Sequence, residues 1–471
     1  MYLLVFAADA AGKVAHPLDE FTYGESWLLD GARQVAQGAG LYAPADQIPL
    51  MHTAYTPVYY ALVGGLQRIL GDSGYIVGRL VSLAATLGGA TALAWSVQRL
   101  TQRWSVGLLA AGLMLTQNLT ILLWAPLHRV DPLALGLTLL GLALVSAGRV
   151  QVSAVVFVLA TMTKQTFFVA PVAAAITLWP CRASFARFVA IVGGGLVVAV
   201  AAAQWLTHGW FLWHTVVANN NGADLITFSA LMGSFLQFNG LPVLASLASL
   251  GLPASRAEWL WRLYFIGSLL TLPTIAKLGA SSNYWLETTA ASAALLALAS
   301  YKLLARPQAR LIAPTLLAGA LLVAIPAYQA AAVEATNNLA EVVPPSRPRY
   351  LSLVTDTGVA PYRVDAAFVA RIAREPGELL TDNSGLAVAA GKRIAYEFQI
   401  FQLLHVERVW SEQPIVAAIK ARRFSLVALM HPLEGAVPGA RWTPAVHRAL
   451  VAAYAPAGAE AGFWLYRPGA N

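Results

Sequence analysis

The sequence predicts a polytopic α-helical membrane protein with about 11 transmembrane helices, the first of them fragmentary, and a small C-terminal soluble α/β domain. Three observations support this fold class. Of the 471 residues, 58% are hydrophobic and only 11% are charged, whereas about a quarter of the residues of soluble globular domains are charged. Apolar windows recur along residues 1–330. Charged residues become frequent again in residues 331–471.

The N-terminus, MYLLVFAADAAG, provides about half of a membrane span before polar residues begin. It has neither the charged n-region nor the clear cleavage pattern of a signal peptide. We interpret it as the end of a first helix and expect the full-length form of the protein to begin upstream.

The apolar windows that follow are interpreted as spans, judged against the roughly 20 residues that a helix needs to cross a bilayer. Two of them are short and are separated by Lys164, and such broken helices are often found beside a membrane cavity. The windows lie at residues 76–98, 105–125, 131–148, 150–163, 165–180, 188–206, 236–252, 259–276, 284–301 and 311–330.

Basic residues gather in alternate loops and orient the chain, because short cytoplasmic loops are rich in Lys and Arg. The segment TPVYYALVGGLQRIL, residues 56–70, would reverse every later loop if it crossed, so we interpret it as an interfacial helix. Residues 12–75, the loop 207–235 and the domain 331–471 then lie outside. The inside loops contain Arg99, Arg103, Arg149, Arg182, Arg187, Arg256, Arg262, Lys302, Arg306 and Arg310.

Residues 331–471 have the pattern of a soluble α/β domain. GELLTDN, RFSLVALM and AGFWLYRP predict short strands, and EQPIVAAIKARR predicts an amphipathic helix. The Pro-rich segment VVPPSRPR, residues 342–349, is typical of a stiff linker. We therefore divide the chain into a membrane domain, residues 1–330, and a soluble domain, residues 331–471.

Composition also excludes several functions. The net charge of +8 does not indicate nucleic-acid binding, because many basic residues lie singly or in pairs between apolar runs and do not form one soluble basic face. The single cysteine, Cys181, cannot form an intrachain disulfide. We interpret His16, His52 and His128 as loop residues. A divalent cation, Mg or Mn, shared by acids of the first loop is an open alternative.

A few charges lie where a membrane span begins or ends. Arg129 and Asp131 flank one such boundary, Lys164 separates the two short spans, and Lys277 and Glu287 flank GASSNYWLE. Charges near a bilayer are costly and usually face an interior cavity or a partner. We therefore expect a polar cavity that opens to the outside. The outer loop beside it contains the acids Asp19, Glu20, Glu25 and Asp30.

The order of these segments resembles a known family. An outer loop with carboxylates, then YTPVYYALVGGLQRILG, GRLVSL, RVDPLALGLTLLGLAL, LATMTKQ and GASSNYWLE, is similar to the polyprenyl-phosphate-dependent glycosyltransferases of the GT-C superfamily. These include bacterial aminoarabinose transferases and protein O-mannosyltransferases. The resemblance covers roughly residues 16 to 290. It implies an inverting sugar transfer from a polyprenyl-phosphate donor to a lipid, glycan or protein acceptor, on the extracytoplasmic side of a bacterial inner membrane.

Such a transfer needs a carboxylate that accepts the acceptor's proton and cations or donors that hold the leaving phosphate. The resemblance implies a base on the first outer loop. Glu25, which precedes the helix GARQVAQG, is the first choice, and Asp19 or Glu20 is the alternative. Asp131 is a further catalytic candidate. The candidates for substrate binding are Arg79, Arg129, Lys164, Lys277, Asn283, Tyr284 and Glu287.

Several of these residues also have a structural interpretation. Glu25 stands at a helix start, where acids are favoured, and Asp131 precedes Pro132 as an N-cap would. Arg79 and Lys164 could extend to the membrane interface. Two other functions stay open. One is a lipid or sugar transporter or flippase, for which inverted repeats and midplane sites are typical; the other is a non-catalytic scaffold that binds polysaccharide.

Overall fold

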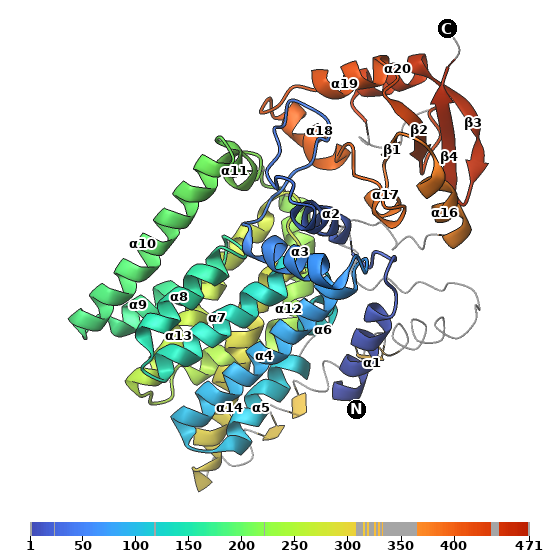
Figure 1. Ribbon diagram of the computed structural model, residues 1–471. Coiled ribbons are helices and arrows are strands. Elements are labelled where there is room, and N and C mark those ends of the chain that lie inside the picture. The colour runs from blue at the N-terminus through green and yellow to red at the C-terminus, as the bar shows by residue number, and fades with distance from the viewer. Residues whose placement is uncertain are drawn as a thin grey trace.

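The computed structural model describes residues 2–22, 24–116, 119–220, 222–307, 365–434 and 442–469, and single positions between 314 and 332. A bundle of helices makes up most of the molecule, and the C-terminal sheet lies beyond one end of it (Figure 1). The predicted linker 342–349 and the predicted domain boundary at 331 lie outside the described residues. Most of the predicted span 311–330 lies outside them too.

The helices of the bundle follow the predicted apolar windows. They are α4 (Ile76–Thr101), α5 (Trp104–Thr116), α6 (Leu119–Trp124), α7 (Val130–Ser146), α8 (Val150–Thr161), α9 (Val169–Leu178), α10 (Arg182–Leu206), α12 (Leu225–Ser249), α13 (Arg256–Thr271) and α14 (Leu286–Leu304). Within the described part of the chain, α4, α10 and α12 are long and apolar enough to cross a membrane. The helices α5, α7, α8 and α9 are apolar but shorter.

Close packing of α4 against α7 brings the N-terminal ends of these two helices together. Gly89 of α4 faces Gly136 of α7, and a Cβ on Gly136 would lie 2.4 Å from the backbone oxygen of Ala85. Such contact between backbones at small residues is typical of helix pairs in membranes. The first turns of α4 and α7, which contain Arg79 and Asp131, are therefore neighbours.

Two helices begin well before their predicted windows. α10 begins at Arg182 and not at 188, and α12 begins at Leu225, so the outer loop predicted to end at 235 ends at Asp224. The Asp224 carboxylate accepts hydrogen bonds from two backbone amides of the first turn of α12. This cap satisfies amides that would otherwise lack a partner and allows the helix to begin earlier.

The predicted first outer loop contains two helices of its own. α1 (Tyr2–Val14) precedes it, and α2 (Glu25–Ala36) and α3 (Val58–Leu70) lie within it. α3 coincides with the segment predicted as an interfacial helix. α2 packs on α3 and also on the C-terminal domain, so it lies between the two parts of the molecule (Figure 1).

The C-terminal domain contains a four-stranded sheet in the order β1-β2-β4-β3. β1 (Glu378–Thr381) and β2 (Phe424–Leu429) are parallel, and β4 (Phe463–Pro468) is antiparallel to both β2 and β3 (Tyr454–Glu460). The three segments predicted as strands contain β1, β2 and β4. The prediction lacks β3, because its sequence YAPAGAE contains Pro and Gly, which a strand tolerates only at an edge or a bulge.

Helices cover both faces of this sheet and share its cores with the first outer loop. They are α16 (Ala366–Arg374), α17 (Ser384–Ala389), α18 (Phe398–Val406), α19 (Gln413–Lys420) and α20 (Pro444–Ala453). Val427 packs with α18 to α20 in a core that includes Leu50. Leu426, on the other face, packs with α16 and α17 in a core that includes Leu29. The outer loop therefore contributes to both cores of the C-terminal domain.

Candidate active site

Glu25, the first choice for the base, forms a buried ion pair with Arg79. Glu25 is the first residue of α2, and Arg79 lies in the first turn of α4, 54 positions later. The guanidinium donates from Nε to Oε1 and from Nη2 to Oε2, each at 3.0 Å, and both side chains are fully buried. Such paired charge-assisted hydrogen bonds are short, strong and geometrically specific.

Backbone amides satisfy the rest of the Glu25 carboxylate. It accepts hydrogen bonds from the amides of Phe21 at 2.8 Å, Thr22 at 3.4 Å and His128 at 2.7 Å. Burial alone would raise the pKa of Glu25, but Arg79 and these amides hold the pKa below its usual value. A buried carboxylate that already accepts five hydrogen bonds is a weak proton acceptor, so this geometry favours a structural role for Glu25.

Arg79, a predicted substrate ligand, holds the segment that precedes α2. It donates to the backbone oxygens of Lys13, His16 and Asp19 at 2.6 to 2.7 Å. These bonds attach the end of α1 and the turn after it to the first turn of α4. Within the described part of the chain, the Arg79 guanidinium contacts the Glu25 carboxylate and backbone oxygens of residues 13–19. It also lies over two aromatic rings, those of Phe21 and Tyr75.

Asp19 is accessible, unlike Glu25 and Asp131. Its side chain is 19% exposed, whereas those of the other two acids are fully buried. The Asp19 Oδ2 atom lies 3.1 Å from Nδ1 of His16, and Arg79 holds the Asp19 backbone oxygen. Asp19 thus combines a fixed backbone with a carboxylate that another molecule can reach.

Glu20 is half-buried against the C-terminal domain. Its Oε1 atom accepts hydrogen bonds from the Gly24 amide and from the amide and hydroxyl of Ser26, at 2.9 to 3.0 Å. Its Oε2 atom faces Gly385 of α17, where an added Cβ would lie only 3.0 Å away. Burial raises the pKa of Glu20 to about 7, because the hydrogen bonds compensate only in part. Glu20 therefore titrates near neutral pH.

Gly24 joins this segment to the charges at the end of the bundle. Its φ is 100°, and a Cβ would lie 2.4 Å from Nη1 of Arg129, so both the backbone conformation and the available space require glycine. The Arg129 guanidinium also lies over the ring of Trp124, at 5.1 Å from its centre. The loop that contains Asp19 and Glu20 therefore packs directly against Arg129 at Gly24.

Four predicted site residues, from three separate parts of the sequence, form one buried cluster in the structure. Lys164 Nζ donates to Oδ1 of Asp131, and this oxygen also accepts a hydrogen bond from Asn283 Nδ2 at 2.8 Å. The Nε atom of Arg129 lies 3.9 Å from the other carboxylate oxygen. All four side chains are buried. Lys164 lies in the break between α8 and α9, and this break allows it to reach α7.

Tyr55 belongs to this cluster, although the sequence analysis did not select it. Its hydroxyl lies 3.4 Å from Arg129 Nη2, and its ring centre lies 5.8 Å from Lys164 Nζ. The ring centre of Tyr284, a predicted substrate ligand, lies 5.3 Å from Lys164 Nζ. Both tyrosines are half-buried. The available signal was the aromatic–proline segment YTPVYY, which contributed to the family resemblance and, from Thr56 onward, to the predicted interfacial helix, but Tyr55 itself was not assigned to the site.

Lys277 and Glu287 lie near the cluster. Among the described residues, neither forms a hydrogen bond with Asp131 or Lys164. Lys277 Nζ donates to Asn219 Oδ1 at 2.6 Å. Burial and the neighbouring charge of Lys164 lower the pKa of Lys277 to about 8. Glu287 is buried on α14, beside Tyr264 of α13.

The sequence matches no protein-family model and no curated protein. The structure, in contrast, resembles ArnT from Cupriavidus metallidurans in the apo state, with a TM-score of 0.63 at 13% identity, over 99% of this chain and 97% of that chain. The chain has the ArnT fold. The predicted resemblance to the GT-C glycosyltransferases is thereby confirmed for the fold.

Two further structures share this fold. ArnT bound to undecaprenyl phosphate gives a TM-score of 0.61 at 12% identity, over 99% of this chain and 97% of that chain. The oligosaccharyltransferase AglB from Archaeoglobus fulgidus, in complex with an inhibitory peptide and a dolichol-phosphate, gives 0.50 at 12% identity, over 91% of this chain and 69% of that chain. The ArnT fold thus extends over nearly the whole of this chain, including its C-terminal part.

The first-loop acids do not fit the Mg or Mn site that the sequence analysis left open. No group of three His, Cys, Asp or Glu side chains able to hold a metal ion occurs among the described residues. Arg79 and backbone amides occupy the Glu25 oxygens, and Oε1 of Glu20 accepts three hydrogen bonds. Mg and Mn require several oxygen ligands at once, and Glu20 and Glu25 do not supply them together in this arrangement.

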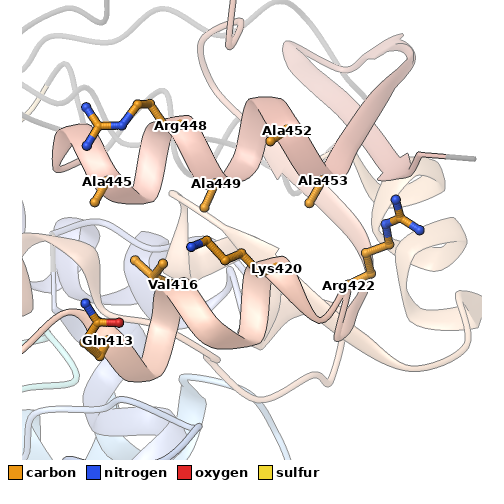
Figure 2. A pocket seen from close by; sticks show the side chains of 9 residues that line it. All are labelled: Gln413, Val416, Lys420, Arg422, Ala445, Arg448, Ala449, Ala452 and Ala453. Carbon is orange, nitrogen blue, oxygen red and sulfur yellow. The ribbon is translucent and has the colours of Figure 1, made fainter. Parts of the chain in front are cut away.

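A separate groove lies on the C-terminal domain between α19 and α20 (Figure 2). Alanines of α20 line it together with the basic residues Lys420, Arg422 and Arg448. It contains none of the predicted site residues, and α19 and α20 lie on the side of the domain away from the bundle (Figure 1). The candidate active site is therefore the polar cluster around Arg129, Asp131 and Lys164.

Proposed function

We propose that this chain is an integral-membrane glycosyltransferase that transfers a sugar from a polyprenyl-phosphate donor to a lipid, glycan or protein acceptor. The observation that carries the proposal is an excess of positive charge in the polar cluster. Arg129, Lys164 and Lys277 lie near one another, and Asp131 is the carboxylate that pairs with the first two. Buried cations are costly in a membrane protein. An anionic phosphate that arrives from the bilayer would offset this cost.

The solved structures with this fold support this class of donor. ArnT has been solved with bound undecaprenyl phosphate, and AglB with a dolichol-phosphate and a peptide. Both lipids carry a phosphate on a long polyprenyl chain. In the proposed site, Lys164, Arg129 and Lys277 bind the phosphate, and Tyr55 and Tyr284, whose rings lie beside Lys164, border it.

We assign the general base to Asp19. In the proposed reaction its carboxylate accepts the proton of an acceptor hydroxyl while the hydroxyl oxygen attacks the anomeric carbon of the sugar. The bond between this carbon and the phosphate oxygen breaks, and the phosphate leaves with the electron pair. Lys164 and Arg129 stabilise the negative charge that develops on it. Attack opposite to the leaving phosphate inverts the anomeric centre.

Glu25 has a different role in this proposal. It anchors the start of α2 through Arg79 and thereby holds the turn that contains Asp19. Glu20, with a pKa of about 7, is the second choice for the base, because a group that titrates near the working pH suits proton transfer.

Loss of either of two lysines tests the donor site. Lys277→Met is expected to weaken binding of undecaprenyl phosphate about tenfold, and Lys164→Met about tenfold to a hundredfold, because each removes a charged hydrogen-bond donor from the phosphate. Binding is measured by titrating undecaprenyl phosphate into the protein in nanodiscs of neutral lipid.

Lys420→Met is the matched control, since this exposed lysine of α19 lies on the side of the C-terminal domain away from the bundle. Lys277→Met leaves the Asp131–Lys164 pair intact, so weaker binding by this variant is not a result of lost folding. Wild-type affinity in both cluster variants would refute the proposed donor site. An equal loss in Lys420→Met would indicate non-specific attraction and would also refute it.

The proposed sidedness has its own test, because Cys181 is exposed in the turn between α9 and α10, directly before Arg182. In intact spheroplasts, a membrane-impermeant maleimide is expected to leave Cys181 unlabelled and to label it only after permeabilisation. In a Cys181→Ser background, a cysteine that replaces the exposed Gln47 is expected to react from outside. Labelling of native Cys181 in intact spheroplasts would reverse the proposed orientation.

A further inference from the structure

The segment 50–56 has almost no regular secondary structure, yet its conformation is defined by many partners. The Thr53 amide donates to Nδ1 of His214 at 3.1 Å. The backbone oxygen of Ala54 accepts a hydrogen bond from Gln165 Nε2 at 2.8 Å. Because these partners come from distant parts of the chain, the surrounding structure, and not local propensity, sets the path of this segment.

The C-terminal domain holds the beginning of the segment. Leu50 forms a parallel β-bridge with Tyr396, in which the Leu50 amide donates to the Ala395 oxygen at 2.9 Å and the Leu50 oxygen accepts from the Glu397 amide at 3.0 Å. Two residues later, the His52 amide donates to Oε2 of Glu397 at 2.9 Å. Glu397 is fully buried. It therefore holds the segment through both its backbone and its side chain.

The other end of the segment reaches the cation cluster. Tyr55 follows His52 by only three positions, and its hydroxyl contacts Arg129 while its ring lies beside Lys164. Three residues of extended chain span at most about 10 Å. The contact between Glu397 and His52 therefore acts within a few residues of Tyr55, next to the bonds that His214 and Gln165 make with Thr53 and Ala54.

The C-terminal domain also contacts the segment that contains the acids. Trp27 of α2 donates from Nε1 to the Ser384 hydroxyl at 3.2 Å. Arg33, on the same helix, donates to the Val388 oxygen at 2.7 Å. Together with the packing of Gly385 against Glu20, these contacts bring the domain onto both chain segments that border the cluster.

We propose that Glu397 of the C-terminal domain is a positioning residue for the donor site: it holds Leu50 and His52 and thereby keeps Tyr55 in contact with Arg129 and Lys164. The inference rests on the proposed function, because that function assigns these three side chains to the donor phosphate. It makes the C-terminal domain a part of the catalytic unit. The site would then form correctly only when this domain is docked on the outer loop.

Three substitutions at the junction test this inference in the full-length protein in nanodiscs. Glu397→Ala is expected to speed amide hydrogen exchange in residues 50–56 and to weaken binding of undecaprenyl phosphate about tenfold, with unchanged exchange in α4 and α7. Glu397→Gln keeps the oxygen that accepts from the His52 amide and is expected to restore most of both losses. The amide is a close substitute because burial raises the pKa of Glu397 well above its usual value. Tyr55→Phe is expected to weaken lipid binding without faster exchange.

Glu378→Ala is the control, because this exposed acid pairs with Arg423 inside the C-terminal domain, and it is expected to match the wild type. If Glu397→Ala loosens residues 50–56 but binds the lipid normally, the positioning role is excluded. Should Glu397→Ala fail to fold, wild-type affinity in Tyr55→Phe would exclude it equally well. A wild-type protein that binds no undecaprenyl phosphate would instead refute the proposed function, and the two failures are thus distinguishable.

Discussion

Replacing Asp19 with Asn is expected to lower the rate of sugar transfer by about two to four orders of magnitude, which is the usual contribution of a positioned general base. The amide has the same shape as the carboxylate but cannot accept the acceptor's proton. Binding of undecaprenyl phosphate is expected to be unchanged, since the cations that hold the phosphate are intact. The measurement is single-turnover transfer from a polyprenyl-phosphate sugar, together with a lipid titration of the same preparation.

The matched variant is Glu20→Gln, one position further along the same turn. It is expected to retain most of the transfer rate, because Glu20 is already held by Ser26 and Gly24 and faces Gly385. If Glu20→Gln abolishes transfer and Asp19→Asn does not, the base is Glu20. In that case the wild-type rate is expected to rise with pH through about 7, as Glu20 loses its proton.

Replacing Arg79 with Met is expected to cause the largest loss of stability in the chain, about 3–5 kcal/mol. The substitution leaves the Glu25 carboxylate fully buried without its cation and removes the donors that hold three backbone oxygens of the preceding turn. Thermal unfolding of the detergent-solubilised protein, followed by tryptophan fluorescence, measures the effect. The double variant Arg79→Met with Glu25→Gln is expected to recover part of the loss, because it removes the unpaired charge.

Arg187→Met provides the comparison for this change. Arg187 is exposed in the first part of α10, so its removal is expected to alter the unfolding temperature by no more than a typical surface substitution. If Arg79→Met unfolds at the wild-type temperature and loses only lipid binding, Arg79 contacts the donor phosphate, as the sequence analysis proposed.

Several residues that lie together in the polar cluster stand out in the sequence because an unpaired charge in an apolar region costs free energy. Arg129, Asp131 and Lys164 are charges at the ends of apolar spans, and such charges need a partner wherever they lie. Tyr55 produced no comparable signal, because a tyrosine near a membrane surface is ordinary. Its role depends on a segment held by Glu397, more than 300 positions away.

The assignment of Glu25 illustrates the same limit. In the sequence, Glu25 at a helix start is the first choice for the base, and the upstream pair Asp19 and Glu20 is the alternative. In the structure, Arg79 and three backbone amides saturate Glu25, whereas Asp19 stays accessible. Whether a carboxylate has all its hydrogen-bond partners depends on groups that come from distant positions in the chain, here Arg79 and His128. The residues next to Glu25 in the sequence do not predict these partners.

By itself, the sequence determined the class of protein, the approximate positions of the described apolar helices, three of the four strands and the clustering of isolated charges. These features follow from hydrophobic burial and from the cost of unpaired charge, which act on each segment separately. Only the tertiary structure decided the start of α12, the edge strand β3, the burial of Glu25 against Arg79 and the docking of the C-terminal domain on the outer loop. Each of these depends on contacts between segments, whose energy is absent until the chain has folded.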